Sequence, residues 1–114
     1  MPEEPRVFTY EQALETFPRV RELTATAVRQ VETLFNRVQS RDELERRQEE
    51  IEDEVGTVIQ AWARRVSSLG CHVKGLWLVD WDNGSGYYCW RYPEESIAFF
   101  HTYDDGYPGR IPIN

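Results

Sequence analysis

The residues best suited to chemistry gather near the C-terminus, around His101. Asp104 and Asp105 follow it closely, and an imidazole with nearby carboxylates has the donor types of a divalent-metal site. The histidine could equally act as a general base whose tautomer an aspartate fixes. The sequence contains no HExxH motif, no zinc-spaced Cys/His cluster and no aspartate-rich calcium loop, so a structural, hydrogen-bonded histidine is the simpler explanation. His101, Asp104 and Asp105 are therefore candidate metal ligands, and the cofactor, if there is one, is unknown.

Two arginines and a glutamate near this histidine could bind a small ligand. Arg110 follows a loop with Gly106 and Gly109, which could hold its guanidinium over an anion or pin the C-terminus through an arginine-to-carbonyl contact. Arg91 shares a predicted sheet face with Asp80, where the two could form a structural ion pair. The candidate ligand-binding residues are His101, Arg110, Arg91 and Glu94.

The sequence identifies no catalytic residue. It has no Gly-x-Ser-x-Gly elbow, no phosphate loop, and no Ser or Cys beside an evident His and Asp that would activate it. These features favour a protein that is not an enzyme, without deciding the question.

Composition limits the class of protein. A chain of 114 residues suits one domain, residues 1–114, and its 40 % hydrophobic and 29 % charged residues are typical of a water-soluble globular protein. The net charge of -7 disfavours nucleic acid and anionic lipid as partners, and no apolar run is long enough to span a bilayer. Five of the seven net negative charges lie between Arg41 and Glu54.

The two cysteines, Cys71 and Cys89, form neither a CxxC pair nor a disulfide framework, and we expect two buried free thiols. The acidic start of the chain, MPEEPRVF, lacks the apolar segment of a secretory signal. We expect a cytoplasmic protein.

Hydrophobic periodicity predicts a long helical hairpin over residues 9–70. Thr9 and Gln12 have the spacing of a capping box, and Pro18 either kinks a helix that begins at Tyr10 or lies in a first turn capped by Thr16. A second helix over residues 42–69, capped by Ser40 or Asp42 and ended by Gly70, would be about 42 Å long. Such a rod is longer than so small a domain can cover. The acidic tip is therefore expected to project into solvent or to bind a partner.

After Gly70 the period changes to two, which predicts a three-stranded antiparallel sheet within residues 71–114. The strands are expected at residues 71–81, 87–92 and 97–103, with an Asp82-Asn83-Gly84-Ser85-Gly86 turn and a C-terminal loop or edge segment. Pairing Trp90 with Phe99 and Tyr88 with His101 puts the Trp residues and His101 on one aromatic face. The other face, with smaller apolar groups, would pack on the helices. The aromatic face would need cover from a second subunit or a ligand.

Several segments resemble the bacterial family known as domain of unknown function 2203. They are Leu69-Gly70-Cys71, Leu78-Val79-Asp80-Trp81, Cys89-Trp90-Arg91, Glu94, the segment from Ile97 to His101, and Gly106-Tyr107-Pro108-Gly109-Arg110. The beginning, Phe8-Thr9 before a long helix pair, is also similar. Pro93 stands where the resemblance leads us to expect Gly, Phe100 stands in place of Trp, and the first hairpin is short. The resemblance implies an architecture and no established activity.

The sequence therefore predicts an α+β fold in which a helical hairpin packs on a small antiparallel sheet. The leading hypothesis for function is a non-enzymatic interaction module that forms a homodimer. The alternative is a protein that binds a small ligand or divalent metal, possibly an enzyme, with its site near His101 and Arg110.

Overall fold

The computed structural model, which describes residues 6–113, opens with one long helix. Helix α1 (Tyr10–Asn36) begins at the predicted capping box: the Gln12 N–H donates to Thr9 Oγ1 at 3.1 Å, and the Thr9 N–H donates to the Gln12 side chain at 2.9 Å. Pro18 lies inside the helix, so the start at Tyr10 is the correct alternative. The predicted domain over residues 1–114 extends at both ends beyond the described residues, and its extent stays a prediction.

The second arm of the hairpin is two helices rather than the single helix predicted. Helix α2 (Arg41–Arg46) is capped by Ser40, whose Oγ accepts from the Glu43 N–H at 3.1 Å. The chain then leaves helical geometry at Arg47, with φ -106° and ψ 11°, before α3 (Gln48–Ser67) begins. The Arg47 side chain pairs with Glu43 and Glu50 across this break, which gives the corner its own local stabilisation. Gly70 follows α3 with φ +92°, and the chain turns there towards the sheet.

The predicted first strand is wrong, because its residues fold into a hairpin. Strands β1 (His72–Gly75) and β2 (Leu78–Asp82) pair antiparallel, with an irregular register at Gly75. Trp77 adopts φ +58°, which allows a tight reversal where the sequence pattern indicated continuous strand. A single glycine at position 75 is too weak a turn signal to predict this reversal.

The sheet has five strands in the order β1-β2-β3-β4-β5, and all its neighbouring pairs are antiparallel. After β2, the chain forms β3 (Gly86–Arg91) and β4 (Phe99–Thr102). A short 3-10 turn, η1 (Tyr107–Gly109), leads to the edge strand β5 (Ile111–Pro112). The α+β class is therefore confirmed, whereas the strand count is five rather than three.

The large aromatic side chains face the helices, contrary to the prediction. Val79, Trp81 and Trp90 are fully buried there, and the Phe17 ring of α1 meets the Trp90 ring edge-on at 5.4 Å between centroids. The Trp81 indole N–H donates to Thr16 Oγ1 at 2.8 Å. The predicted assignment of faces failed because indole rings, rather than smaller side chains, fill the space between the sheet and α1. The expected exposed aromatic slab therefore does not exist among the described residues.

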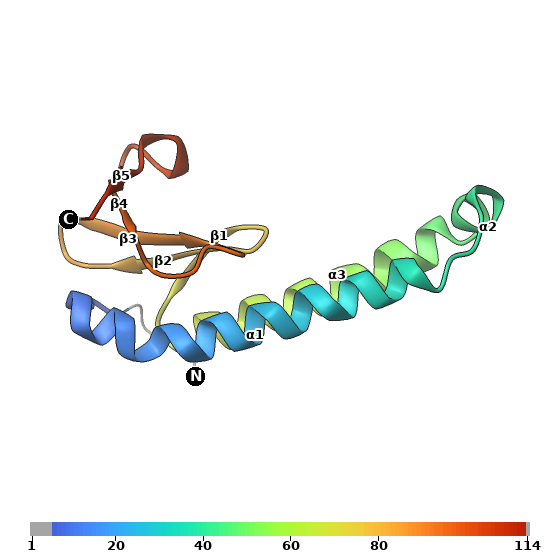
Figure 1. Cartoon of the computed structure of the whole chain (residues 1–114), viewed down its shortest axis with the longest axis horizontal. Helices are drawn as coiled ribbons and strands as arrows, with labels where there is room; N and C mark the ends of the chain where they lie inside the picture. The colour runs from blue at the N-terminus through green and yellow to red at the C-terminus, as the bar shows by residue number, and fades with distance from the viewer. Residues whose placement is uncertain (1–5, 114) are drawn as a thin grey trace.

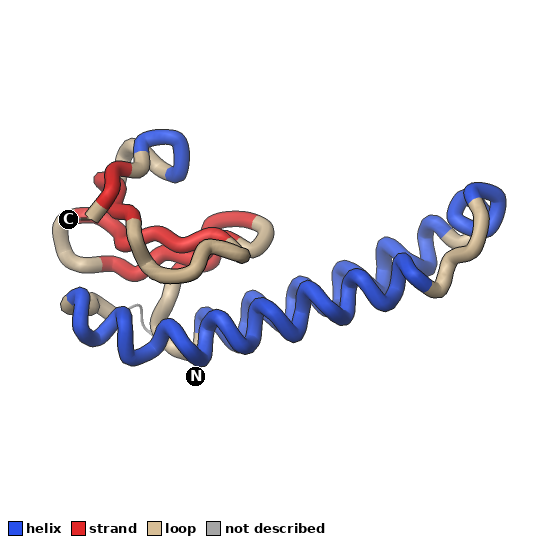
Figure 2. The backbone as a smooth tube through the Cα atoms, viewed as in Figure 1, coloured by secondary structure: helices blue, strands red, loops and turns tan. Residues whose placement is uncertain are grey.

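The hairpin extends well past the sheet, as the sequence predicts. Figure 1 shows α1 and α3 side by side beyond the strands, with α2 at the far tip. In Figure 2 the strands lie only over the end of the hairpin at which α1 begins and α3 ends. The longest dimension of the molecule is 49 Å, against 33 and 25 Å for the others. Among the residues described, no helix combines the length with the apolar character that a bilayer crossing demands.

Candidate functional site

The sheet face opposite the helices, which we call the outer face, carries a buried polar cluster. Asp80 of β2 pairs directly with Cys89 of β3, so both side chains emerge on this face. Tyr87 pairs with His101 of β4, and that brings the imidazole to the same side. Three neighbouring strands thus each contribute one functional group.

The position of His101 corrects the predicted register. The prediction paired Tyr88 with His101 and Trp90 with Phe99, whereas Tyr87 and Cys89 are the true partners. The loop between β3 and β4 spans residues 92–98, whereas the predicted pairs require a hairpin that closes around Glu94-Glu95. A slip of one residue exchanges the faces of a whole strand, so His101 lies away from the tryptophans.

The polar cluster is compact and closed to solvent. Asp80, Cys89 and His101 are 1 %, 0 % and 3 % exposed, and their potential ligand atoms lie within 4.8 Å of one another. His101 Nε2 lies 2.8 Å from Asp80 Oδ2, and its Nδ1 lies 2.7 Å from the Thr102 carbonyl oxygen. The predicted Asp80–Arg91 ion pair is therefore wrong, since the partner of Asp80 is His101.

Two buried polar atoms on the outer face find no hydrogen-bond partner among the described residues: Asp80 Oδ1 and His72 Nε2. His72 is the register partner of Asp80 on β1, and its ring packs on Tyr87 at 5.3 Å between centroids. Buried groups of this kind are normally satisfied, so each calls for an explanation.

A bidentate ion pair lies beside the cluster. Arg110 donates from Nη1 to Glu94 Oε1 at 2.9 Å and from Nη2 to Oε2 at 2.7 Å, while the Arg91 backbone N–H donates to Oε1 at 2.8 Å. The guanidinium is 4.0 Å from the centroid of the Phe99 ring and 4.4 Å from that of the Tyr107 ring. The anion that Arg110 binds is therefore the Glu94 carboxylate of the same chain. This ion pair takes the place of the predicted contact between Arg110 and a backbone carbonyl.

Burial and neighbouring charges shift the pKa values of Glu94, Arg110 and Cys89. Burial alone would raise the pKa of Glu94, but the hydrogen bonds from Arg110 and the Arg91 backbone outweigh it and lower the pKa. The pKa of Arg110 rises because Glu94 stabilises its charge. Burial, together with the Asp80 carboxylate, raises the pKa of Cys89 to about 12, so its thiol is protonated at neutral pH.

The structure brings together only part of the predicted site. Glu94 and Arg110 meet, whereas the Arg91 side chain is exposed and lies 5.5 Å from the Tyr107 ring centroid. Asp104 and Asp105 are exposed in the turn after β4, and the cluster that contains His101 is built from Asp80 and Cys89 instead. The predicted pairing of Tyr88 with His101 puts the neighbouring Cys89 on the opposite face. The register of the second hairpin is the signal that joins Cys89 and His101.

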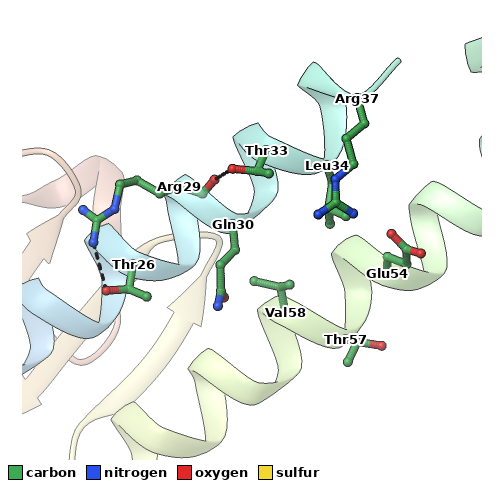
Figure 3. Close-up of a pocket in the computed structure, with 9 residues that line it drawn as sticks. All are labelled: Thr26, Arg29, Gln30, Thr33, Leu34, Arg37, Glu54, Thr57 and Val58. Atoms are coloured by element: carbon green, nitrogen blue, oxygen red, sulfur yellow. Dashed lines mark hydrogen bonds between the residues drawn. The ribbon is translucent and has the colours of Figure 1, made fainter.

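A second candidate site is a groove between α1 and α3, beyond the sheet. The groove holds a hollow of about 480 Å³. Figure 3 shows its lining residues, with Gln30 of α1 and Val58 of α3 pointing into the space between the helices. Arg37 and Glu54 lie towards its distal end. The residues that line it are Thr26, Arg29, Gln30, Thr33, Leu34, Arg37, Glu54, Thr57 and Val58. A smaller hollow of about 190 Å³ shares Thr26, Gln30 and Val58 and continues the groove along the hairpin.

The predicted free thiols are confirmed, since Cys71 and Cys89 are both buried and unpaired.

No curated protein and no solved structure matches the chain. A family model described as an uncharacterized conserved protein, DUF2203, matches residues 6–113, which span the hairpin and all five strands. The chain therefore belongs to the DUF2203 family.

Proposed function

We propose that this protein is a homodimeric interaction module in which the distal halves of two hairpins pack against each other. The observation that carries the proposal is the incomplete burial of apolar residues beyond the sheet. Ile51 is buried there, but other aliphatic side chains remain half-buried, among them Val31, Leu34, Val38, Val55 and Val58. Two isolated helices cannot enclose such a stripe, and a second pair can.

Charge supports a second copy as the occupant of the groove. The α1 side of the groove carries Arg29 and Arg37, whereas α3 carries Glu54, which follows four other acids of the same helix: Glu49, Glu50, Glu52 and Asp53. Of the twofold arrangements, the one that brings α1 of one copy against α3 of the other makes basic residues meet acidic ones. The acidic balance of the chain argues against nucleic acid on the same surface.

A cytoplasmic location is part of the proposal. Cys71 and Cys89 are free thiols in separate parts of the fold, a pattern suited to a reducing compartment. The aromatic face of the sheet is covered by α1 and offers no second surface for dimerisation. The proposal therefore rests on the hairpin.

Light scattering coupled to gel filtration tests the proposal with two variants of equal charge change. Leu34→Glu puts a carboxylate in the groove, whereas Gln60→Glu puts one on an exposed position of α3. We expect about 27 kDa, twice the chain mass of 13.5 kDa, for the unmodified protein and for Gln60→Glu, and a monomer for Leu34→Glu. A monomeric unmodified protein at tens of micromolar, or a dimeric Leu34→Glu, would refute the proposal.

A further inference from the structure

We propose that Asp80, Cys89 and His101 form a site on the outer face of the sheet for one thiol-preferring divalent ion such as Zn²⁺. The three residues offer one oxygen, one sulfur and one nitrogen donor, the set from which zinc sites are built. Each comes from a different strand, and all three are buried. The site is distinct from the hairpin groove and does not depend on the proposed dimer.

Hydrogen-bond geometry assigns His101 Nε2 as the ligand atom. The Thr102 carbonyl can only accept, so the Nδ1 that lies 2.7 Å from it must carry the proton. A backbone carbonyl that accepts from Nδ1 is the arrangement that fixes a metal-binding histidine and leaves Nε2 for the ion. Nε2 is also the nitrogen that faces Asp80 and the rest of the cluster.

The contact between His101 and Asp80 contains a proton that an ion would replace. Because Nδ1 already donates, the 2.8 Å contact of Nε2 with Asp80 Oδ2 needs one proton, carried either by the imidazole or by the carboxyl group. In both cases the pair has no net charge. The second carboxyl oxygen, Oδ1, is buried without a partner among the described residues, and a cation would satisfy it.

The proton balance favours a charge of two on the ion. Without metal the cluster holds the Cys89 thiol and the uncharged Asp80–His101 pair. When the ion binds, the thiol proton and the shared proton leave, and a thiolate, a carboxylate and a neutral imidazole remain. The two negative charges balance one divalent cation, so the buried net charge stays zero. A monovalent or trivalent ion would leave an unbalanced charge in the interior, which is costly.

Arg110 is placed to support a metal-bound thiolate. Its Nη1 lies 3.9 Å from Cys89 Sγ, and the same guanidinium is held by Glu94. A donor at the sulfur stabilises negative charge on a ligand thiolate. Zinc with three protein ligands keeps a fourth position, for water or another small ligand.

The test uses full-length protein freed of metal by a chelator and then titrated with Zn²⁺ and Co²⁺. Calorimetry in two buffers of different ionisation enthalpy should give one Zn²⁺ per chain and two protons released per ion. Co²⁺, a spectroscopic probe for zinc sites, should produce a thiolate-to-metal absorption band. Cys89→Ser should remove the band and weaken Zn²⁺ binding roughly 100-fold or more.

Cys71→Ser is the matched control, because Cys71 is equally buried but lies outside the cluster. It should keep the cobalt band and the zinc affinity, and in this variant Cys89 is the sole remaining thiol, so the result holds even if Cys89→Ser fails to fold. Failure of Zn²⁺ to bind, cobalt binding without a thiolate band, or equal effects of the two substitutions would overturn the site. None of these outcomes bears on the hairpin dimer, which is measured by mass.

Discussion

The Arg110 guanidinium binds the Glu94 carboxylate through two parallel hydrogen bonds, and this contact ties the C-terminal segment to the loop after β3. The side chains of Arg110 and Glu94 are 12 % and 27 % exposed, so solvent only partly screens the pair. The same arginine stacks on Phe99 and contacts Cys89. The pair therefore determines how the C-terminal segment covers the outer face.

Replacing Glu94 by glutamine should lower the free energy of unfolding by about 2 kcal/mol at neutral pH, because charged hydrogen bonds are lost and Arg110 keeps an unpaired charge. Urea unfolding followed by tryptophan fluorescence measures the change. Glu95→Gln serves as the control, since Glu95 is exposed, and it should change stability by less than about 0.5 kcal/mol. Equal effects of the two substitutions would show that the ion pair does not stabilise the fold.

The contribution of Glu94 should also depend on pH. Its pKa in the folded protein lies below the ordinary value of 4.5 because Arg110 and the Arg91 N–H stabilise the carboxylate. A depressed pKa means that the stabilisation is complete above the ordinary value and is lost as the pH falls through the folded value. The stability difference between the unmodified protein and Glu94→Gln should therefore shrink between neutral pH and about pH 3. A difference that stays constant would contradict the assignment.

Thr24 and Trp62 should be energetically coupled across the hairpin. The Trp62 indole N–H donates to Thr24 Oγ1 at 2.8 Å, and the Thr24 hydroxyl donates to the Val20 carbonyl, all in the buried core. Thr24→Val leaves the indole N–H unpaired and should cost about 1–3 kcal/mol. In a double-mutant cycle with Trp62→Phe, the coupling energy should be about 1 kcal/mol. Additive effects would mean that the hydrogen bond contributes nothing to the association of α1 with α3.

Two glycines should respond in opposite ways to the same substitution. A Cβ on Gly56 in α3 meets nothing within 4 Å, so Gly56→Ala should raise the free energy of unfolding by up to about 1 kcal/mol. A Cβ on Gly86 would lie 2.5 Å from the His101 carbonyl oxygen, which belongs to the backbone of the paired strand. Gly86→Ala should therefore destabilise the protein by about 1–3 kcal/mol. Thermal unfolding of both variants checks the signs, and a stabilised Gly86→Ala would contradict the β3–β4 pairing.

Local signals in the sequence predicted the parts of the fold that depend on local physics. The capping box at Thr9, the hairpin and the turn around Gly84 follow from short-range hydrogen bonding and periodicity, and the structure contains all of them. The sequence also predicts a cap at Ser40 or Asp42, and the structure uses Ser40. The reversal at Trp77 did not follow, because a tryptophan at positive φ carries no turn signal. Long-range pairing decides such positions.

The candidate site was only half predictable for the same reason. Glu94 and Arg110 could be chosen from their types, but their mutual contact depends on how the C-terminal segment folds back on the sheet. His101 is a candidate on residue type alone, and its partners depend on a register that one extra loop residue changes. The cluster of Asp80, Cys89 and His101 therefore follows from the strand register and not from the local sequence.

The central claim, that the distal hairpin is the contact between two copies, is tested most directly by hydrogen exchange at two protein concentrations. Dimerisation through the groove predicts that amides in residues 28–38 and 51–61 gain more protection in the concentrated sample than those of the sheet. Exchange that is independent of concentration throughout the chain, or protection that appears on the sheet instead, would contradict the account.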